Sequence, residues 1–291
     1  MRYLNNPRIL LVTAMTVFGT VGIFVREIPL SSEEIALYRA ALALILIGAF
    51  LLLTRQKIKL ENPRFTLTLL LISGAAMALN WVLLFEAYKH TTVSNATLAY
   101  YFAPTIVTVF STVLFKERIT PVSVICFIGS TVGIVLITGT QSGGGEDLIG
   151  ILFGLGAAVL YATVVLMNKL LSGVQGIHRT FMQFLSAVAV LLPYVLIGKG
   201  MNLGTLNSRA WIALLIVGIV HTGITYCMYF TSIGKLPGQK VALLSYVDPL
   251  VAVLASVFIL GESISAPQII GGIMILGFSL FSEIAPKKDK N

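Results

Sequence analysis

Charged residues are scarce in this chain of 291 residues. Asp, Glu, Lys and Arg make up 11% of it, against about 25% in soluble globular proteins. The few charges are separated by apolar blocks close to the roughly 20 residues that a helix needs to cross a bilayer. The net charge of +8 is spread over the ends of these blocks, without the basic patch and interleaved aromatics of a nucleic-acid site. We therefore expect the protein to lie in a lipid bilayer and to bind no nucleic acid.

Cysteine and histidine are rare, with two and three residues. Cys126 and Cys227 both lie inside apolar blocks, so neither a disulfide framework nor a metal site of the usual spacing is expected. The chain also lacks H-E-x-x-H, G-x-S-x-G and the phosphate-binding G-x-x-x-x-G-K-[ST]. We expect no enzyme activity, no metal and no cofactor.

The apolar blocks predict an all-α integral membrane protein with ten transmembrane helices, numbered here as spans 1 to 10. A membrane β-barrel would show alternating segments of about ten residues instead. Span 1 follows the basic residues Arg2 and Arg8, but it is long and no A-x-A-like cleavage site follows it, so we expect it to be retained. The spans lie at about 9–28, 34–53, 65–86, 93–115, 121–139, 148–170, 179–198, 209–231, 238–260 and 267–284.

The distribution of Lys and Arg predicts the orientation of the spans. Fifteen of these 20 residues fall in the segments that lie on the same side as the N-terminus, four lie in the opposite loops, and Arg39 lies within span 2. Cytoplasmic loops carry the excess of positive charge. We therefore expect a multi-pass protein of the cytoplasmic (inner) membrane with both termini in the cytoplasm.

The second half of the chain repeats the first at a distance of 145 residues. Tyr101 aligns with Tyr246, Pro104 with Pro249, and Glu117 with Glu262. We expect each of the two glutamates to cap its helix or to form a salt bridge in the turn that follows. Each half holds five spans, an odd number, so the second half enters the membrane inverted. Inverted repeats are typical of secondary transporters. We expect one repeat over 1–140, a second over 148–284 and a cytoplasmic tail at 285–291.

Two stretches carry a resemblance to a known family: YYFAPTIVTVFSTVLFKERIT (100–120) and SYVDPLVAVLASVFILGESIS (245–265). They resemble the paired signature of EamA-type transporters of the drug/metabolite transporter superfamily, and ALYRAALALILIG (36–48) looks like that family's second helix. The resemblance implies a secondary transporter with a central cavity lined by spans 1–4 and 6–9, and spans 5 and 10 at the periphery. It also implies small metabolites as cargo, often amino acids, frequently exported. One departure is Phe18-Gly19, where Trp-Gly is common in the family.

Asp248 is an isolated carboxyl near the middle of span 9. A charge at that depth costs about 2.5–3.5 kcal/mol, so the side chain is expected to face the bundle interior or a wet cavity. Its counterpart in the first half is Ala103, so the acid is a feature of one repeat. Two interpretations stay open: the carboxyl takes part in function, by proton coupling or by binding a cation, or it ties span 9 to a neighbour.

Several other polar or aromatic residues of the spans are candidates for function. His221 is a second candidate for proton coupling, the alternative being an ordinary hydrogen-bonded histidine. Arg39 either snorkels to the outer interface or pairs with a carboxylate, from an outer loop or from the substrate. Pro104 and Pro249 remove backbone donors and are candidate gating kinks, the alternative being a role in packing geometry alone. The remaining candidates for substrate contact are Phe18, Asn80, Trp81, Tyr101, Tyr161, Tyr226 and Tyr246.

The sequence thus predicts a secondary active transporter that exports a small metabolite, such as an amino acid or an amine, by alternating access, with protons as the candidate coupling ion. A flippase for a lipid or lipid-linked molecule, or an uncoupled uniporter, stays open. The acidic charge at mid-span favours an amine-bearing cargo over a phosphate. Gly129 and Gly133 form a GxxxG motif in span 5, a pattern of close helix contact, so a monomer or a weak homodimer is expected.

Overall fold

The computed structural model describes residues 6–55, 63–114, 121–139, 145–171, 174, 176–198, 200–233, 235–236 and 244–284. Over these residues every regular element is helical, as predicted. Six helices or helix pairs are long and apolar enough to cross a membrane, and three shorter apolar helices, Val124–Leu136, Val247–Phe258 and Ala266–Phe281, fall in spans 5, 9 and 10. Span 4 is divided into two helices, and this completes the ten predicted spans.

The five spans of the first half correspond to seven helices. Spans 2, 3 and 5 are each one helix, whereas spans 1 and 4 are each divided in two. The helices are α1 (Pro7–Gly19), α2 (Val21–Arg26), α3 (Ser32–Leu53), α4 (Pro63–His90), α5 (Val93–Tyr100), α6 (Ala103–Leu114) and α7 (Pro121–Gly139).

The second half holds spans 6 to 10, of which spans 6 and 7 are each one helix. Span 8 combines two α-helices with a π-helical segment, η3. The elements are α8 (Gly145–Leu170), α9 (Gly176–Ile197), the 3₁₀ turn η2 (Leu203–Thr205), α10 (Ser208–Leu215), η3 (Ile216–Ile224), α11 (Thr225–Ile233), α13 (Val247–Phe258) and α14 (Ala266–Ile284).

Local sequence explains where these helices begin. Ser31 and Glu34 form a capping box at the start of α3, in which each side chain bonds the backbone N–H of the other. The Asn6 and Thr92 side chains accept backbone N–H groups at the starts of α1 and α5. Proline occupies the first position of α1, α4 and α7, where its missing N–H has no helical partner to lose.

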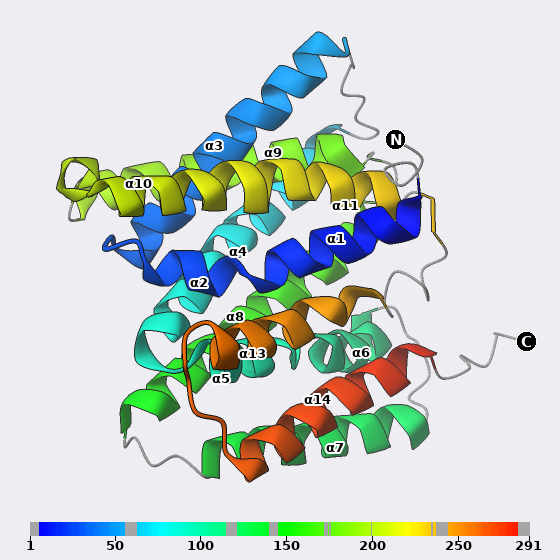
Figure 1. The fold of residues 1–291 in the computed structure, drawn as a ribbon. Helices are drawn as coiled ribbons and strands as arrows, with labels where there is room; N and C mark the ends of the chain where they lie inside the picture. The colour runs from blue at the N-terminus through cyan, green and yellow to red at the C-terminus, as the bar shows by residue number, and fades with distance from the viewer. Residues whose placement is uncertain are drawn as a thin grey trace, which may run out of the picture.

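The helices pack as a bundle in which α4 contacts α3, α8 and α9. The largest buried cluster lies among these helices and includes Trp81, Phe85 and Phe184. Helices α7 and α14 lie against each other along one edge of the bundle (Figure 1), as the family resemblance implied for spans 5 and 10. Helix α1 begins and α14 ends on the same side of the bundle (Figure 1).

The GxxxG motif of α7 is used inside the chain. A Cβ atom at Gly133 would lie 2.7 Å from the carbonyl oxygen of Gly271, and one at Gly129 would collide with the ring of Phe278. Both partners belong to α14. The close helix contact that the motif predicts is therefore made within the chain, where α14 occupies the glycine face.

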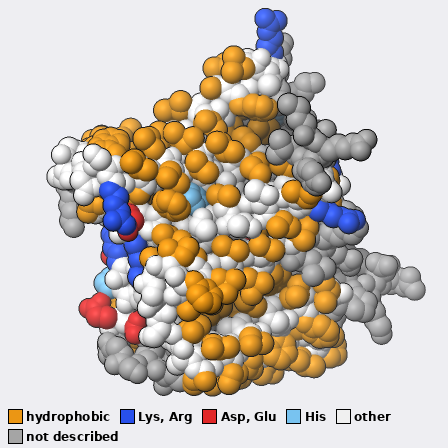
Figure 2. Space-filling view, viewed as in Figure 1, with side chains coloured by type: hydrophobic (Ala, Val, Ile, Leu, Met, Phe, Trp, Pro, Cys, Tyr) orange, Lys and Arg blue, Asp and Glu red, His pale blue; other side chains and the backbone are white. Residues whose placement is uncertain are grey.

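Hydrophobic side chains cover most of the face shown in Figure 2. Charged side chains gather at the edge where α2 ends and α10 begins (Figures 1 and 2). Arg209 and Glu27 form an exposed ion pair at this end of the bundle. Such a surface suits a protein whose sides contact lipid and whose helix ends contact water.

Candidate functional site

Spans 4 and 9 are interrupted at equivalent positions of the two repeats. Tyr101 ends α5 and is followed by α6, which starts at Ala103. Tyr246 directly precedes α13. Pro104 and Pro249 therefore lie in the first turn of a new half-helix, where a proline is tolerated. The kinks predicted at these prolines are therefore breaks between two half-helices.

Spans 1 and 8 are irregular in the same region. Thr20 separates α1 from α2, and η3 is π-helical over nine residues. Gly19 brings the break of span 1 against span 9, because a Cβ atom there would lie 2.5 Å from the carbonyl oxygen of Asp248. Irregular backbone at membrane depth is tolerated where it is buried in protein or lines a cavity. Broken helices of this kind build the binding sites of transporters.

Asp248 lies in the first turn of α13 and is only partly buried. The hydroxyl of Tyr101 donates a hydrogen bond to its Oδ2 atom at 2.6 Å. The start of a helix favours negative charge, and a hydrogen bond to a carboxylate is stronger than one between neutral groups. The structure thus provides two stabilising interactions for a charged Asp248, one from each repeat.

Four tyrosines surround this bond. The ring centroid of Tyr101 lies 5.8 Å from that of Tyr100 and 6.4 Å from that of Tyr246. Tyr161, on α8, extends the group, with its ring 5.4 Å from Tyr100. The side chain of Tyr161 is 40% exposed, whereas that of Tyr246 is buried. The predicted residues Tyr101, Tyr161 and Tyr246 therefore lie together, beside Asp248.

A second aromatic group joins spans 1, 3, 7 and 8. The ring of Tyr226 lies 5.2 Å from Phe18 and 5.4 Å from Phe184, and Phe184 lies 5.5 Å from Trp81. All contacts are edge-on or tilted, the arrangement that aromatic pairs prefer. Phe18, Trp81 and Tyr226 were predicted from sequence, whereas Phe184 was missed, because a phenylalanine in an apolar span carries no distinguishing signal.

Arg39 lies inside the bundle and is 4% exposed. Its Nε atom donates to Thr222 Oγ1 at 2.7 Å. Its Cζ atom lies 4.6 Å from the ring centroid of Trp81 and 5.6 Å from that of Phe85. Arg39 therefore does not snorkel to the interface in this conformation.

His221 and Asn80 are held by contacts away from Asp248. The His221 ring has Nε2 3.0 Å from Thr20 Oγ1 and Nδ1 3.2 Å from the carbonyl oxygen of Ile216. The Asn80 amide donates to the carbonyl oxygen of Ala157 at 2.6 Å. His221 thus connects η3 to the break of span 1, and Asn80 connects α4 to α8.

Glu262 binds groups from three different spans. We call this cluster the outer latch, after the side of the membrane that the Lys and Arg distribution predicts for it: Arg26, Val93, Ser256 and Glu262. Glu262 forms an ion pair with Arg26 and accepts hydrogen bonds from Ser256 and, at 2.9 Å, from the backbone N–H of Val93. Glu262 was predicted to cap or salt-bridge, but its partners in span 1 and span 4 were missed. Its repeat partner Glu117 lies outside the described residues.

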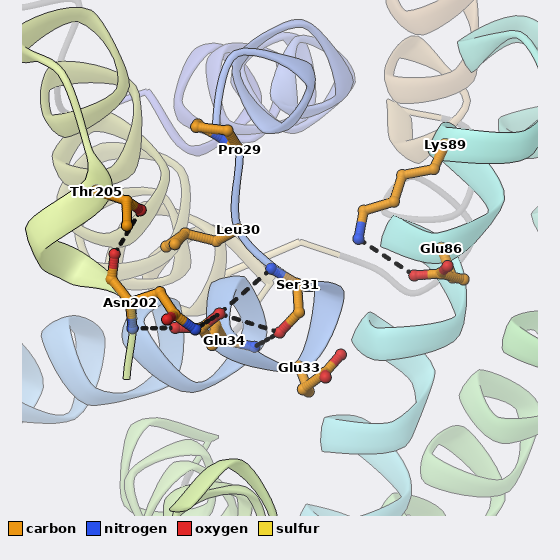
Figure 3. Close-up of a pocket in the computed structure, with 9 residues that line it drawn as sticks. All are labelled: Pro29, Leu30, Ser31, Glu33, Glu34, Glu86, Lys89, Asn202 and Thr205. Atoms are coloured by element: carbon orange, nitrogen blue, oxygen red, sulfur yellow. Dashed lines mark hydrogen bonds and ion pairs between the residues drawn. The ribbon is translucent and has the colours of Figure 1, made fainter. Parts of the chain in front are cut away.

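A pocket of about 500 Å³ opens beside the first turn of α3 and the end of α4 (Figure 3). Two of its three carboxylates, Glu34 and Glu86, are already engaged. Glu34 accepts the backbone N–H of Asn202 at 2.7 Å, and Glu86 accepts the Ser32 hydroxyl at 2.5 Å and contacts Lys89 at 3.3 Å. Asp248 and the two aromatic groups do not line this pocket, so we do not place the central site there.

Comparison with protein families gives two matches along the chain. The model of the EamA-like transporter family matches residues 7–139 and again residues 148–282. The chain belongs to the EamA-like transporter family. The double match corresponds to the two halves recognised from the repeat of Tyr101 and Pro104 at Tyr246 and Pro249.

Relatives of this EamA-like protein occur in bacteria and archaea. An uncharacterized transporter of Bacillus subtilis strain 168, YxxF, is 29% identical over 91% of this chain and 85% of its own length. An uncharacterized transporter of Clostridium kluyveri is 27% identical over 86% and 85%, and one of Archaeoglobus fulgidus is 26% identical over 91% and 92%. A protein of known crystal structure has the same fold, with a TM-score of 0.66, 17% identity, and 97% and 99% coverage.

These matches establish an EamA-like multi-pass membrane protein of a transporter family. The three relatives are named as transporters and not as enzymes, and their names give no substrate.

Proposed function

We propose that this protein is a secondary active transporter that exports a small polar metabolite, such as an amino acid or amine, by alternating access coupled to protons. The observation that carries the proposal is the hydrogen bond between Tyr101 and Asp248, where broken helices of the two repeats meet. A carboxyl at the junction of two moving halves can bind a cationic group from one side and release it to the other.

Proton coupling follows from the cost of an isolated charge. A carboxylate that loses water needs a positive partner or a proton. If an ammonium group of the cargo neutralises Asp248, the departure of that cargo favours uptake of a proton. The hydrogen bond from Tyr101 and the start of α13 stabilise the charged form between these two events. One group thus exchanges cargo for a proton.

The tyrosine group beside Asp248 and the second aromatic group suit an organic cargo. Aromatic faces attract cations and stack on planar groups, and Tyr161 is exposed enough to be reached. Tyr101, Tyr246, Tyr226, Phe18 and Trp81 are the contact residues we propose.

The outer latch supports alternating access. It holds α2 and α5 of the first repeat to the end of α13 in the second. With both termini cytoplasmic, as the Lys and Arg distribution indicates, these groups lie at the outer face. We propose that this conformation is closed to the outside and that breaking the latch opens it.

A flippase is less well supported. Such a protein would present basic groups for a phosphate at an opening towards lipid, whereas Arg39 is buried inside the bundle. An uncoupled uniporter differs from our proposal only in that Asp248 would not exchange the cargo for a proton. Transport measured with and without a proton gradient separates the two.

Reconstitution tests the proposal. Purified protein would first be screened by thermal shift against the twenty proteinogenic L-amino acids and simple amines, because a ligand of the native state raises its stability. The compound with the largest shift is then followed, radiolabelled, in proteoliposomes under a proton gradient. We expect Asp248→Asn to abolish gradient-driven accumulation. Glu33→Gln, in the pocket beside the first turn of α3, is the control and should keep it. Accumulation at the wild-type rate by Asp248→Asn would show that coupling at Asp248 is wrong.

A further inference from the structure

His90 is the last residue of α4, and both nitrogens of its ring lie near carboxylates. Its Nδ1 atom is 2.7 Å from Oε2 of Glu146, and its Nε2 atom is 3.4 Å from Oε1 of Glu86. Glu86 lies one turn earlier on α4, whereas Glu146 lies in the first turn of α8. The ring also stacks on Phe153 of α8, with 5.6 Å between the ring centroids. His90 therefore connects span 3 of the first repeat to span 6 of the second.

This geometry suits the charged form of the ring. A neutral imidazole has one N–H donor, so its second nitrogen would direct a lone pair at a carboxylate. An imidazolium donates from both nitrogens and binds Glu86 and Glu146 at the same time. Histidine is the side chain that ordinarily changes its charge between about pH 5 and 8. The bridge from α4 to α8 is therefore complete in acid, and at most one hydrogen bond of it remains in alkaline solution.

The contact with Glu146 depends most on the charge of the ring. Glu86 has other partners, because it also binds Lys89 at 3.3 Å and the Ser32 hydroxyl. Glu146 has no second hydrogen-bond or ion-pair partner in the part of the chain that the structure describes. The charged groups on His90's own helix and on the elements packed around it are Glu86 and Lys89 of α4, Glu146 and Asp147 of α8, Glu33 of α3 across the pocket of Figure 3, Arg26 of α2, and Glu262 after α13.

The end of α4 is also bound to the outer latch. Arg26, a member of the latch, donates to the carbonyl oxygens of Tyr88 at 3.2 Å and Thr91 at 2.6 Å. The Thr91 hydroxyl in turn donates to Asp147 of α8 at 2.7 Å. His90 lies between Tyr88 and Thr91 in the chain, so a separation of α8 from the end of α4 also disturbs the contacts of Arg26.

We propose that His90 senses the pH of the solution at the outer face, and that protonation of its ring ties α4 to α8 and holds the outer side closed. This inference rests on the alternating access proposed above and adds a regulation to it. The closed form has the bridge, and the open form, in which the repeats separate at this face, lacks it. Closing therefore favours uptake of a proton, and by linkage acid favours the closed form while a rise in pH favours opening.

Labelling of a buried cysteine from the outside measures this switch. Ser94 is 3% exposed, and its neighbour Val93 binds Glu262 of the latch. Ser94→Cys, in a background with Cys126 and Cys227 replaced, would be exposed to a membrane-impermeant thiol reagent at about pH 5.5 and about pH 8 outside, at fixed internal pH. Each rate is divided by that of the denatured protein at the same pH, which removes the chemistry of the thiol. We expect labelling about threefold faster at the higher pH, because partly exposed ion pairs shift an equilibrium only by small factors.

Substitutions of His90 distinguish a sensor from a structural residue. His90→Gln, which cannot become charged, should label at both pH values as fast as the unsubstituted protein does at the higher one. His90→Lys, which stays charged, should label slowly at both values. The side chains of His90 and Glu146 are 29% and 71% exposed, so the fold should tolerate these changes.

Glu146→Gln removes the carboxylate that the charged ring binds, and it should abolish most of the pH response. Glu27→Gln is the matched control, because Glu27 is a glutamate with an exposed arginine partner at the same end of the bundle. Its pH response should equal that of the unsubstituted protein. The comparison separates loss of the His90 bridge from a general loss of negative charge at this face.

Two results overturn the sensor. One is equal labelling of the unsubstituted protein at both pH values, and the other is an unchanged pH response in His90→Gln. The transport proposal is read from a different measurement, the gradient-driven accumulation of a cargo in proteoliposomes. Absence of accumulation together with a His90-dependent labelling response would contradict coupled transport alone, whereas accumulation without that response would contradict the sensor alone.

Discussion

The phenolic oxygen of Tyr101 lies 2.6 Å from Oδ2 of Asp248, and this hydrogen bond joins the break of span 4 to the break of span 9. The repeat pairs Tyr101 with Tyr246 and Asp248 with Ala103. The mirror-image bond, from Tyr246 to position 103, cannot form, because alanine has no acceptor in its side chain. An almost symmetric frame therefore carries an asymmetric bond, and under the proposed alternating access this bond would give the two states different energies.

Removing the Tyr101 hydroxyl tests how much this hydrogen bond contributes to stability and to transport. We expect Tyr101→Phe to lower stability by about 2 kcal/mol, because it deletes a hydrogen bond to a charged group, and to reduce transport. Tyr100→Phe is the matched control, since the Tyr100 hydroxyl makes no hydrogen bond within the described residues while its ring belongs to the same tyrosine group. Thermal unfolding in detergent measures both variants. Equal effects of the two substitutions would contradict the role given to this bond.

The sequence predicted the spans and the repeat well, because bilayer thickness fixes the length of an apolar block. It also singled out Asp248, since a carboxyl in such a block is costly. The breaks were harder to predict. Pro104 and Pro249 marked two of them, but the break at Thr20 and the π-helical stretch around Thr222 have no proline.

The partners of charged residues could not be predicted from spacing at all. Arg26 and Glu262 are far apart in the chain, and only the packing of α2 against α13 brings them together. The burial of Arg39 was likewise undecided, because a position one and a half turns from a helix end is compatible with the interface or the interior. Three-dimensional neighbours, here Thr222 and Trp81, decide between them.

Gly19 provides a test of the contact between spans 1 and 9. We expect Gly19→Ala to lower stability by about 1–3 kcal/mol, because the added methyl group would lie 2.5 Å from the Asp248 carbonyl oxygen and 2.8 Å from Val251 Cβ. Gly277→Ala in α14 is the control, with no atom within 4 Å of the added Cβ. Alanine favours a helix by roughly 1 kcal/mol over glycine, so the control should be neutral or stabilised. Thermal unfolding of both variants decides, and a tolerated Gly19→Ala would contradict the close approach.

His221 tests whether a proton relay reaches beyond Asp248. The ring contacts Thr20, Ile216 and Phe24 rather than Asp248, so we expect His221→Gln to slow transport through loss of packing and to cost about 1 kcal/mol. The dependence of transport on the proton gradient should stay as in wild type. Initial rates in proteoliposomes at several imposed gradients measure this, with Asp248→Asn in parallel. Loss of gradient dependence in a stably folded His221→Gln protein would restore the relay hypothesis.

The outer latch predicts how the protein opens. Glu262→Ala would leave Arg26 without its counter-ion and the Val93 N–H without its acceptor, at a cost of about 3 kcal/mol in the latched state. Opening towards the outside should therefore become more frequent. A single cysteine at Ser94, buried next to the latch, would report this in a background where Cys126 and Cys227 are replaced.

A membrane-impermeant thiol reagent added from outside provides the measurement. We expect labelling of Ser94→Cys to increase at least tenfold when Glu262→Ala is added. Arg209→Ala is the control, because its ion pair with Glu27 is exposed and exposed pairs contribute about 0–1 kcal/mol. Its labelling should match the unmodified background. Unchanged labelling in Glu262→Ala would show that the contact between α5 and α13, rather than the latch, keeps the outer side closed.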